Sequence, residues 1–268
     1  NADNEWTLRY KDLIKAKSIL FSLHDDNPAL AAHVSDGGIA VTVKDGEIIL
    51  RKGTSDVNVA QINNIPITFG GKATFNVANT LAAVAATYAI GIDLKTIQIS
   101  LVSFNPSTGQ LPGRTNLIDV DTFKVLIDYG HNPSALEALA ALIPHLARGR
   151  KINVGSGTGN RRDVDILDFG RNIGKMYDHI ILCDSDPRRR KKGETSELVR
   201  KGVLSTGFPK NNIQIVLEED AAIRAALKMA KAGDLIVIQA NDVNRAISDV
   251  LEYKENLMLK GDGKKKGM

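Results

Sequence analysis

Cysteine, aromatic residues and long apolar runs are scarce in this sequence, and each shortage excludes a class of protein. Cys183 is the single cysteine, so no disulfide can form within the chain, and its apolar neighbours over 179–183 indicate a buried structural thiol. No stretch approaches the roughly 18 uninterrupted apolar residues of a membrane span, and no signal peptide is recognisable. We therefore expect a cytoplasmic protein that contacts no membrane.

Positive charge is concentrated in two short runs, although the formal net charge is only +4. The runs are Arg188–Lys192 and Lys264–Lys266. Neither is interleaved with aromatic residues, which supply the stacking platforms of single-stranded nucleic acid binding. We expect no nucleic-acid partner. The first run is either a solvated loop or a clamp for phosphates or an acidic polymer.

The first part of the chain predicts a sheet followed by two helices. Asp45-Gly46 lies between β-branched runs and predicts a hairpin. A further strand is expected over 57–67, a helix over 76–90, and a second helix over 94–104 that is capped by Asp93. The chain begins with Asn1 and not with Met, so we expect a fragment of a longer protein.

Between residues 105 and 114 the composition changes to Pro, Ser, Gly and Gln, and beyond it strands and helices alternate. This alternation predicts an α/β fold with a mainly parallel sheet that is covered on both faces. We expect three parts: a first domain over 1–108, a second over 109–255 and a disordered basic tail over 256–268. Strands are expected at 116–120, 123–127, 151–154, 179–183, 212–217 and 234–238, and helices at 134–143, 166–177, 196–204, 220–232 and 243–251.

The stretch Asp128–Pro133 concentrates chemistry at the end of a predicted strand. It holds an acid, an imidazole (His131) and an amide (Asn132), and Pro133 opens the next helix. Open α/β sheets bind ligands at the carboxyl ends of their strands. The alternative is a plain strand-to-helix turn, in which Asn132 or Asp128 caps free backbone N–H groups.

Two further loops follow strands of the same predicted sheet, at 155–163 and 184–194. The first is Gly-rich, but it matches neither a Walker A loop, since no Gly-Lys-Thr/Ser follows, nor a GxGxxG fingerprint, since Asn160 replaces the third glycine. Asp184 ends the next strand as a ribose-binding acid would, which leaves a nicotinamide site as a weak alternative. No HExxH pattern occurs and His131 has no histidine at i+4, so we expect no dedicated metal site.

These motifs together resemble the Mur ligase superfamily, which includes muramyl-peptide ligases and folylpolyglutamate synthases. The resemblance covers nearly the whole chain, and within the superfamily it is strongest to the cyanophycin synthetase family. The stretches that carry it are Asn1–Asp3, Gly70–Ala83, Leu111–Asn116, Asp128–Pro133 and Gly159–Ile166. The resemblance implies part of the central ATPase domain followed by a C-terminal Rossmann-like domain.

The family chemistry is ATP-dependent, ADP-forming amide bond formation through an acyl phosphate, with ATP and Mg²⁺ as cofactors. In the cyanophycin synthetase family, arginine is added to an aspartate backbone, so the implied partners are arginine, aspartate, an acidic polymer and the rest of the parent enzyme. The resemblance implies catalytic roles for Arg114 and His131. It implies nucleotide contacts for Asn76, Asn79, Asp128 and Asn132. It implies substrate contacts for Arg161, Asp163, Asp184, Arg188 and Glu194.

The sequence also departs from the family. The Gly-rich phosphate-binding loop with its lysine and threonine is absent from these 268 residues, so we expect the chain alone to be inactive as a ligase. The nearest alternative is a muramyl-peptide or folylpolyglutamate-type ligase fragment, and the non-enzymatic one is a polymer-binding module. The sequence leaves a homo-oligomer open.

Overall fold

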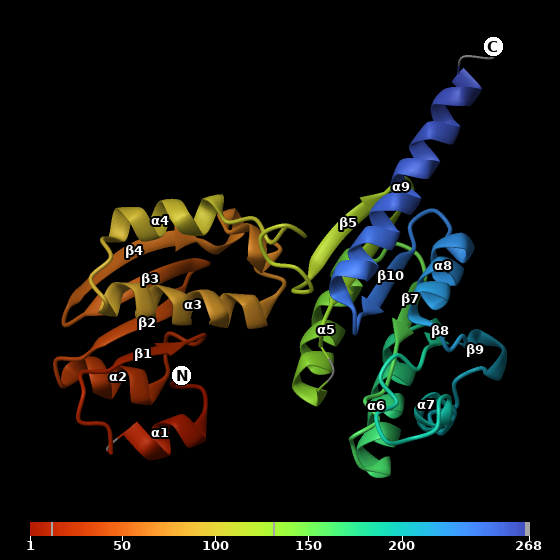
Figure 1. The fold of residues 1–268 in the computed structure, drawn as a ribbon. Coiled ribbons are helices and arrows are strands. Elements are labelled where there is room, and N and C mark those ends of the chain that lie inside the picture. The colour runs from red at the N-terminus through yellow and green to blue at the C-terminus, as the bar shows by residue number, and fades with distance from the viewer. Residues whose placement is uncertain (12, 131, 266–268) are drawn as a thin grey trace. The chain divides into compact units, whose positions relative to one another are not determined.

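The computed structural model describes residues 1–11, 13–130 and 132–265, which fall into two compact units, one over 1–105 and one from 106 onward (Figure 1). The predicted boundary was 108/109. Each unit is an α/β structure with its own sheet and its own core.

Unit 1 has a four-stranded sheet in the order β1-β2-β3-β4. β1 and β2 are parallel, and the other pairs are antiparallel. Asp45 and Gly46 have φ angles of 50° and 79° and connect β2 to β3, which confirms the predicted hairpin. The elements are α1 (Glu5–Lys11), β1 (Ile19–Ser22), α2 (Pro28–Ser35), β2 (Ile39–Lys44), β3 (Glu47–Lys52), β4 (Ser55–Gln61), the 3₁₀ turns Ile62–Asn64 and Pro66–Thr68, α3 (Thr74–Ala89) and α4 (Leu94–Ser103).

The two faces of this sheet follow from the alternation of its apolar residues. Val41 faces the core that α3 and α4 cover, whereas its neighbour Ala40 packs with Leu30 of α2 on the opposite face. The predicted strand over 57–67 is too long, because Pro66 has no N–H to donate to a ladder and the buried Thr68 hydroxyl instead bonds the carbonyls of Ile62 and Ile65 at 2.9 and 2.8 Å.

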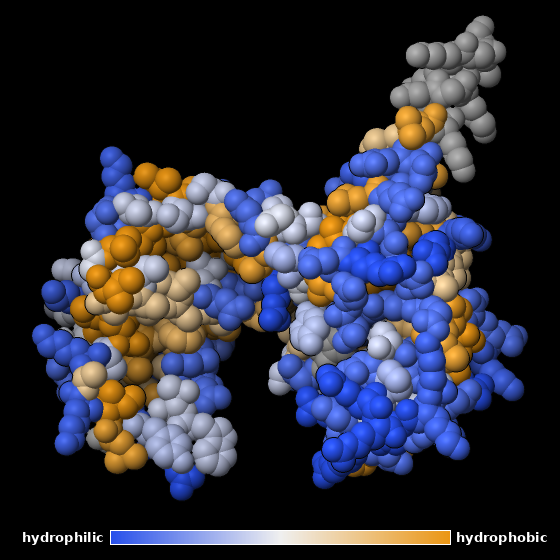
Figure 2. Space-filling view, viewed as in Figure 1, coloured by the Kyte–Doolittle hydropathy of each residue, from blue (hydrophilic) through white to orange (hydrophobic). Residues whose placement is uncertain are grey.

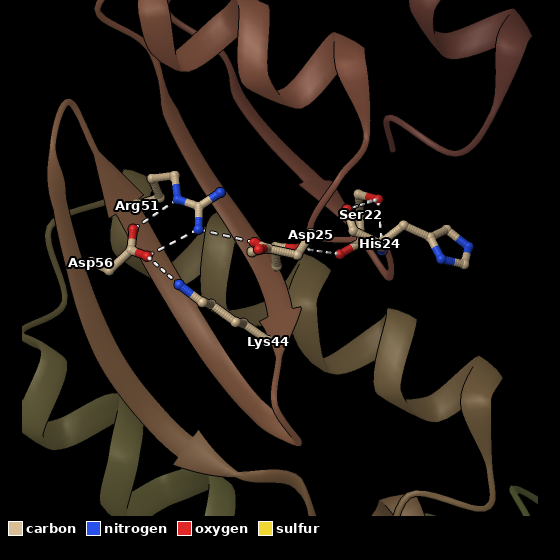
Figure 3. A network of polar contacts seen from close by, with 7 residues as sticks. Ser22, His24, Asp25, Lys44, Arg51 and Asp56 are labelled. Atoms are coloured by element: carbon tan, nitrogen blue, oxygen red, sulfur yellow. Dashed lines mark hydrogen bonds and ion pairs between the residues drawn. The ribbon is translucent and has the colours of Figure 1, made fainter.

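A charged network fastens the edge of this sheet (Figure 3). The Arg51 guanidinium on β3 donates to both carboxylate oxygens of Asp56 on β4 at 2.7 and 2.9 Å, and lies 2.9 Å from Asp25. Lys44 approaches Asp56 at 3.7 Å. The bidentate contact with Asp56 raises the pKa of Arg51, and the hydrogen bonds from Arg51 lower the pKa of Asp56.

Unit 2 has a six-stranded sheet in the order β5-β6-β10-β7-β8-β9. Only β5, which pairs antiparallel with β6, departs from the parallel direction, so the predicted α/β fold with a mainly parallel sheet is confirmed. The elements are β5 (Asn116–Val120), β6 (Phe123–Asp128), α5 (Pro133–Leu146), β7 (Lys151–Gly155), α6 (Asp163–Met176), β8 (His179–Leu182), α7 (Glu194–Leu204), the 3₁₀ turn Lys210–Asn212, β9 (Ile213–Ile215), α8 (Glu219–Met229), β10 (Leu235–Gln239) and α9 (Val243–Lys265).

Both faces of this sheet are covered, as a parallel sheet requires. Helices α5, α6 and α7 pack on one face, where Leu126, Leu182 and Val237 are buried. Helices α8 and α9 pack on the other face, over Val125, Val154 and Ile236. All strands but β5 therefore end at one edge, and the loops after β6, β7, β8 and β10 meet there (Figure 1).

The last helix, α9, continues to Lys265 and so enters the segment 256–268 that was expected to be a disordered tail. Tyr253 and Leu257 follow Val250 at helical spacing and pack against the same core, which extends the helix past residue 251.

Candidate functional site

A cleft of about 290 Å³ opens at the carboxyl edge of the unit 2 sheet. It lies between the start of α5, the loop after β7 and one side of α6. Two residues that were predicted separately, Asn132 and Arg161, both line it. Its other lining residues are Pro133, Leu136, Ser156, Gly157, Thr158, Asp165, Ile166, Asp168, Phe169 and Asn172. We call this space the edge cleft.

Asn132 is the N-cap of α5, since its side-chain oxygen accepts a 2.9 Å hydrogen bond from the amide of Ala135. This oxygen therefore caps a free backbone N–H group, as in the plain strand-to-helix turn considered above. Pro133 occupies the first turn of α5, as predicted. The neighbouring His131 lies outside the described residues, so its catalytic role stays a prediction.

Asp128 is buried at the end of β6 and accepts three hydrogen bonds from described residues of the chain. Its Oδ2 accepts from the Thr115 amide at 2.9 Å and from the Thr115 hydroxyl at 3.2 Å. Its Oδ1 accepts from the Gly130 amide at 2.7 Å. The carboxylate thus fixes the turn after β6 to the segment before β5. A carboxylate oxygen can accept two bonds, and the described residues supply Oδ1 with one, from Gly130.

Arg114 lies in that segment before β5, and its guanidinium lies 5.9 Å from the centre of the Tyr129 ring. The Tyr129 amide in turn donates to the carbonyl of Gly113 at 2.9 Å. The exposed Arg114 side chain is therefore held beside the turn after β6 by a cation–π contact.

A residue that the motifs did not single out, Arg190, ties the loop after β7 to the loop after β8. It pairs with Asp163 at 2.7 Å and with Glu194 at 2.9 Å, two residues predicted to contact substrate. Both carboxylates are thus engaged within the chain, and their substrate roles stay predictions. The only signal in the sequence was the run Arg188–Lys192, in which nothing distinguishes Arg190 from its neighbours.

The other two predicted substrate residues lie in the loop after β8. Asp184 is 1 % exposed; its Oδ2 accepts from the Gly193 amide, and its Oδ1 has no hydrogen-bond partner among the described residues. Burial raises the pKa of this carboxyl, and the Gly193 amide opposes the rise. Arg188 is exposed and pairs with Asp186 at 2.8 Å. Neither residue lines the edge cleft.

The two predicted nucleotide residues of unit 1 lie on α3. Asn76 is buried; its side chain donates to the Ile67 carbonyl at 2.9 Å and accepts from the side-chain amide of Asn79 at 3.2 Å. Asn79 lines an apolar cavity of about 380 Å³ between α3 and α4, together with Phe104. The cavity offers apolar contact beside the side-chain amide of Asn79.

Across the described part of the chain, no group of three or more His, Cys, Asp or Glu residues is placed to hold a metal ion. Among the same residues, no helix is long and apolar enough to cross a membrane.

Comparison with known proteins links these features to one group. Residues 113–241 match the family of the Mur ligase glutamate ligase domain. Over 254 residues the chain is 34 % identical to a cyanophycin synthetase of Geminocystis herdmanii, in an alignment that covers 94 % of this chain and 29 % of that protein. It is 28 % identical to a UDP-N-acetylmuramoyl-L-alanyl-D-glutamate–2,6-diaminopimelate ligase of Aquifex aeolicus, in an alignment that covers 94 % of this chain and 55 % of that one.

Solved structures show the same fold. Escherichia coli FolC in complex with DHPP and ADP has a TM-score of 0.59 at 19 % identity, over 91 % of this chain and 55 % of that chain. The chain spans between a quarter and a third of the length of the cyanophycin synthetases that it matches. The shared fold, the matched domain and the sequence identity agree with the predicted resemblance, and the chain belongs to the Mur ligase superfamily, with its glutamate ligase domain in unit 2.

Proposed function

We propose that this chain is part of an ATP-dependent, ADP-forming amide ligase of the cyanophycin synthetase type, and that the edge cleft holds the amino acid to be added, arginine. The observation that carries the proposal is the meeting of Asn132 and Arg161 in one cleft at the carboxyl edge of a Mur ligase domain. The relatives with 34 % identity are named cyanophycin synthetases, and the resemblance to that family implies the addition of arginine.

The chemistry of the edge cleft suits a cationic amino acid. Arg161 can hold the carboxylate of such a ligand, and Asp165 and Asp168 on α6 can face a guanidinium. Leu136 and Phe169 offer apolar contact to the methylene groups between these charges. Both acids also pair within α6 or at its start, Asp165 with Arg162 at 2.8 Å and Asp168 with Arg171. These pairs are exposed, so a ligand can exchange with them at little cost.

Each unit, taken by itself, has residues of the kinds that bind nucleotides. In unit 1, Asn79 and its apolar cavity suit an adenine ring. In unit 2, the Oδ1 atom of Asp128 accepts one bond from the described residues, and a second from a ribose hydroxyl would suit it. Arg114 is exposed and offers a guanidinium to phosphate groups. In such a ligase the γ-phosphoryl group of ATP would pass to an aspartate side-chain carboxylate with release of ADP, and the amine of arginine would then displace phosphate from the acyl phosphate, forming the amide with loss of a proton.

The test is isothermal titration of the 268-residue chain with L-arginine, L-glutamate and meso-diaminopimelate. We expect L-arginine to bind most tightly, and Arg161→Ala to weaken that binding about tenfold, because a charge-assisted contact is lost. Arg200→Ala is the matched control, since Arg200 lies on α7 and pairs with Glu197 away from the edge cleft. Tighter binding of glutamate or diaminopimelate would favour a folylpolyglutamate or muramyl-peptide ligase instead.

A further inference from the structure

Arg190 differs from the other basic residues of its run by its burial and its partners. In the run Arg188–Lys192 it alone is partly buried, with a side chain that is 17 % accessible, whereas the other four residues are exposed. Arg188 pairs with Asp186 in its own loop, and Lys192 pairs with Glu218. Among the described residues, the side chains of Arg189 and Lys191 form no hydrogen bond or ion pair.

All three nitrogens of the Arg190 guanidinium donate hydrogen bonds, and they reach two loops. Nη1 bonds Glu194 at 2.9 Å, at the start of α7. Nε bonds the carbonyl of Gly159 at 3.0 Å, and Nη2 bonds the carbonyl of Arg161 at 2.9 Å and the carboxylate of Asp163 at 2.7 Å. The planar fork of arginine can satisfy these separate directions at once, whereas the single ammonium of lysine cannot.

The two loops also touch directly at the backbone. The Gly159 amide donates to the Asp186 carbonyl at 3.1 Å. A Cβ at position 159 would lie 2.1 Å from the carbonyl oxygen of Pro187, so only glycine permits this approach. Beside this contact, Arg190 donates a hydrogen bond to the backbone carbonyl of Arg161, a residue that lines the edge cleft.

We infer that Arg190 is a positioning residue: it clamps the loop after β7 to the loop after β8 and so sets Arg161 in place for the carboxylate of the ligand, and it is not itself a contact for an acidic polymer. The exposed residues of the run Arg188–Lys192, such as Arg189, are the ones that can attract an acidic polymer. The ligand part of this inference rests on the proposed function of the edge cleft, but the clamp itself does not.

The experiment compares Arg190→Lys with Arg189→Lys, which keep the same net charge and the same sites for trypsin. The first readout needs no ligand: it is the rate of limited trypsin cleavage after Arg161 and Arg162 in the folded chain. We expect Arg190→Lys to raise this rate about tenfold, because loss of the fork lets the loop open locally, and Arg189→Lys to leave it unchanged. Asp163→Asn, which removes the charge of one partner, should raise the rate by a smaller factor.

The second readout is calorimetric binding of L-arginine. We expect Arg190→Lys to weaken it about fivefold through misplacement of Arg161, with Arg189→Lys equal to the original chain. Cleavage of Arg190→Lys at the original rate would overturn the clamp. If Arg190→Lys is cleaved faster but neither the original chain nor any variant binds L-arginine, the clamp is supported and the proposed substrate is overturned. Equal loosening by both lysine variants would also overturn the inference, because the effect would then not belong to Arg190.

Discussion

The side-chain amide of Gln239 donates a 2.9 Å hydrogen bond to the backbone carbonyl of Gly130, which links the end of β10 to the turn after β6. Gln239 is 1 % exposed, and its own oxygen accepts from the Asn153 amide on β7 at 3.0 Å. Because Asn153 donates to the oxygen of Gln239, the Gln239 nitrogen must face Gly130. Two buried amides from neighbouring strands thus fix the turn that contains the Asp128 and Asn132 side chains.

Replacing Gln239 should therefore loosen that turn and destabilise unit 2. We expect Gln239→Leu to lower the free energy of unfolding by about 2 kcal/mol, because the Gly130 carbonyl loses its side-chain donor and the Asn153 side-chain amide keeps only the longer 3.4 Å bond to the Val237 carbonyl. Urea denaturation measures the loss. Gln214→Leu is the matched control, since Gln214 is exposed on β9 and should change stability by less than about 0.5 kcal/mol. Equal stability of the two variants would contradict this role for Gln239.

Glycine sets the spacing between α6 and α7. A Cβ at Gly202 would lie 2.2 Å from the Leu167 carbonyl oxygen, and one at Gly170 would lie 2.3 Å from that of Val199. Both close contacts are with backbone atoms, so no side chain can rotate to relieve them. We expect Gly202→Ala to cost about 2–3 kcal/mol by forcing the helices apart.

Thermal unfolding of Gly202→Ala measures this cost, and Gly109→Ala is the control. A methyl group at position 109 would meet no atom within 4 Å, and the backbone of Gly109 does not have a positive φ. A melting temperature for Gly202→Ala equal to that of the control would show that the helices are not held at this separation.

The buried carboxylate of Asp234 should make the free energy of unfolding depend on pH. Burial alone would raise the pKa of this carboxyl, but hydrogen bonds from Arg150 and from the backbone amides of Lys231 and Arg150 bring it below its ordinary value. Because the folded-state pKa lies below the unfolded one, the carboxylate stabilises the fold at neutral pH. That contribution is lost as the pH falls below about 4, through the folded-state pKa.

Asp234→Ala should therefore cost about 2–3 kcal/mol at pH 7, because it leaves buried amides unpaired, and the difference from the original chain should shrink toward pH 3. Urea denaturation across pH 3–7 measures both effects. A difference that stays constant or grows toward acid pH would contradict the assignment.

The chain alone should not catalyse amide formation. No Gly-Lys-Thr/Ser loop for the β- and γ-phosphates occurs in its 268 residues. We expect no ADP release above background when the purified chain is incubated with ATP, Mg²⁺, L-arginine and an aspartate polymer, with a complete cyanophycin synthetase as the positive control. Clear turnover by the chain would contradict this expectation.

The sequence predicted those features of both units that depend on a few neighbouring residues. The Asp45-Gly46 hairpin, the Asp93 cap and the Pro133 start of α5 depend on backbone preferences of a few residues, and each occurs as predicted. The 3₁₀ turns after β4 escaped prediction, since they depend on the buried Thr68 hydroxyl.

Features that depend on tertiary packing could not be read from the sequence. Alternation of strands and helices does not say that β10 inserts between β6 and β7, yet this insertion brings Gln239 beside Gly130. In the same way, five consecutive basic residues look alike in sequence, and only the meeting of two loops distinguishes Arg190. Figure 2 shows a strongly hydrophilic surface over α6 and the loop before α7, where one side chain serves the fold and its neighbours face solvent.

Binding of the amino-acid substrate in the edge cleft is tested most directly by backbone NMR with added L-arginine. We expect the amide signals of Ser156, Gly157, Thr158 and Arg161 to shift in a saturable way, and those of the residues that line the α3–α4 cavity to stay unchanged. Saturable shifts confined to other surfaces, or no shifts at millimolar L-arginine, would contradict binding in the edge cleft.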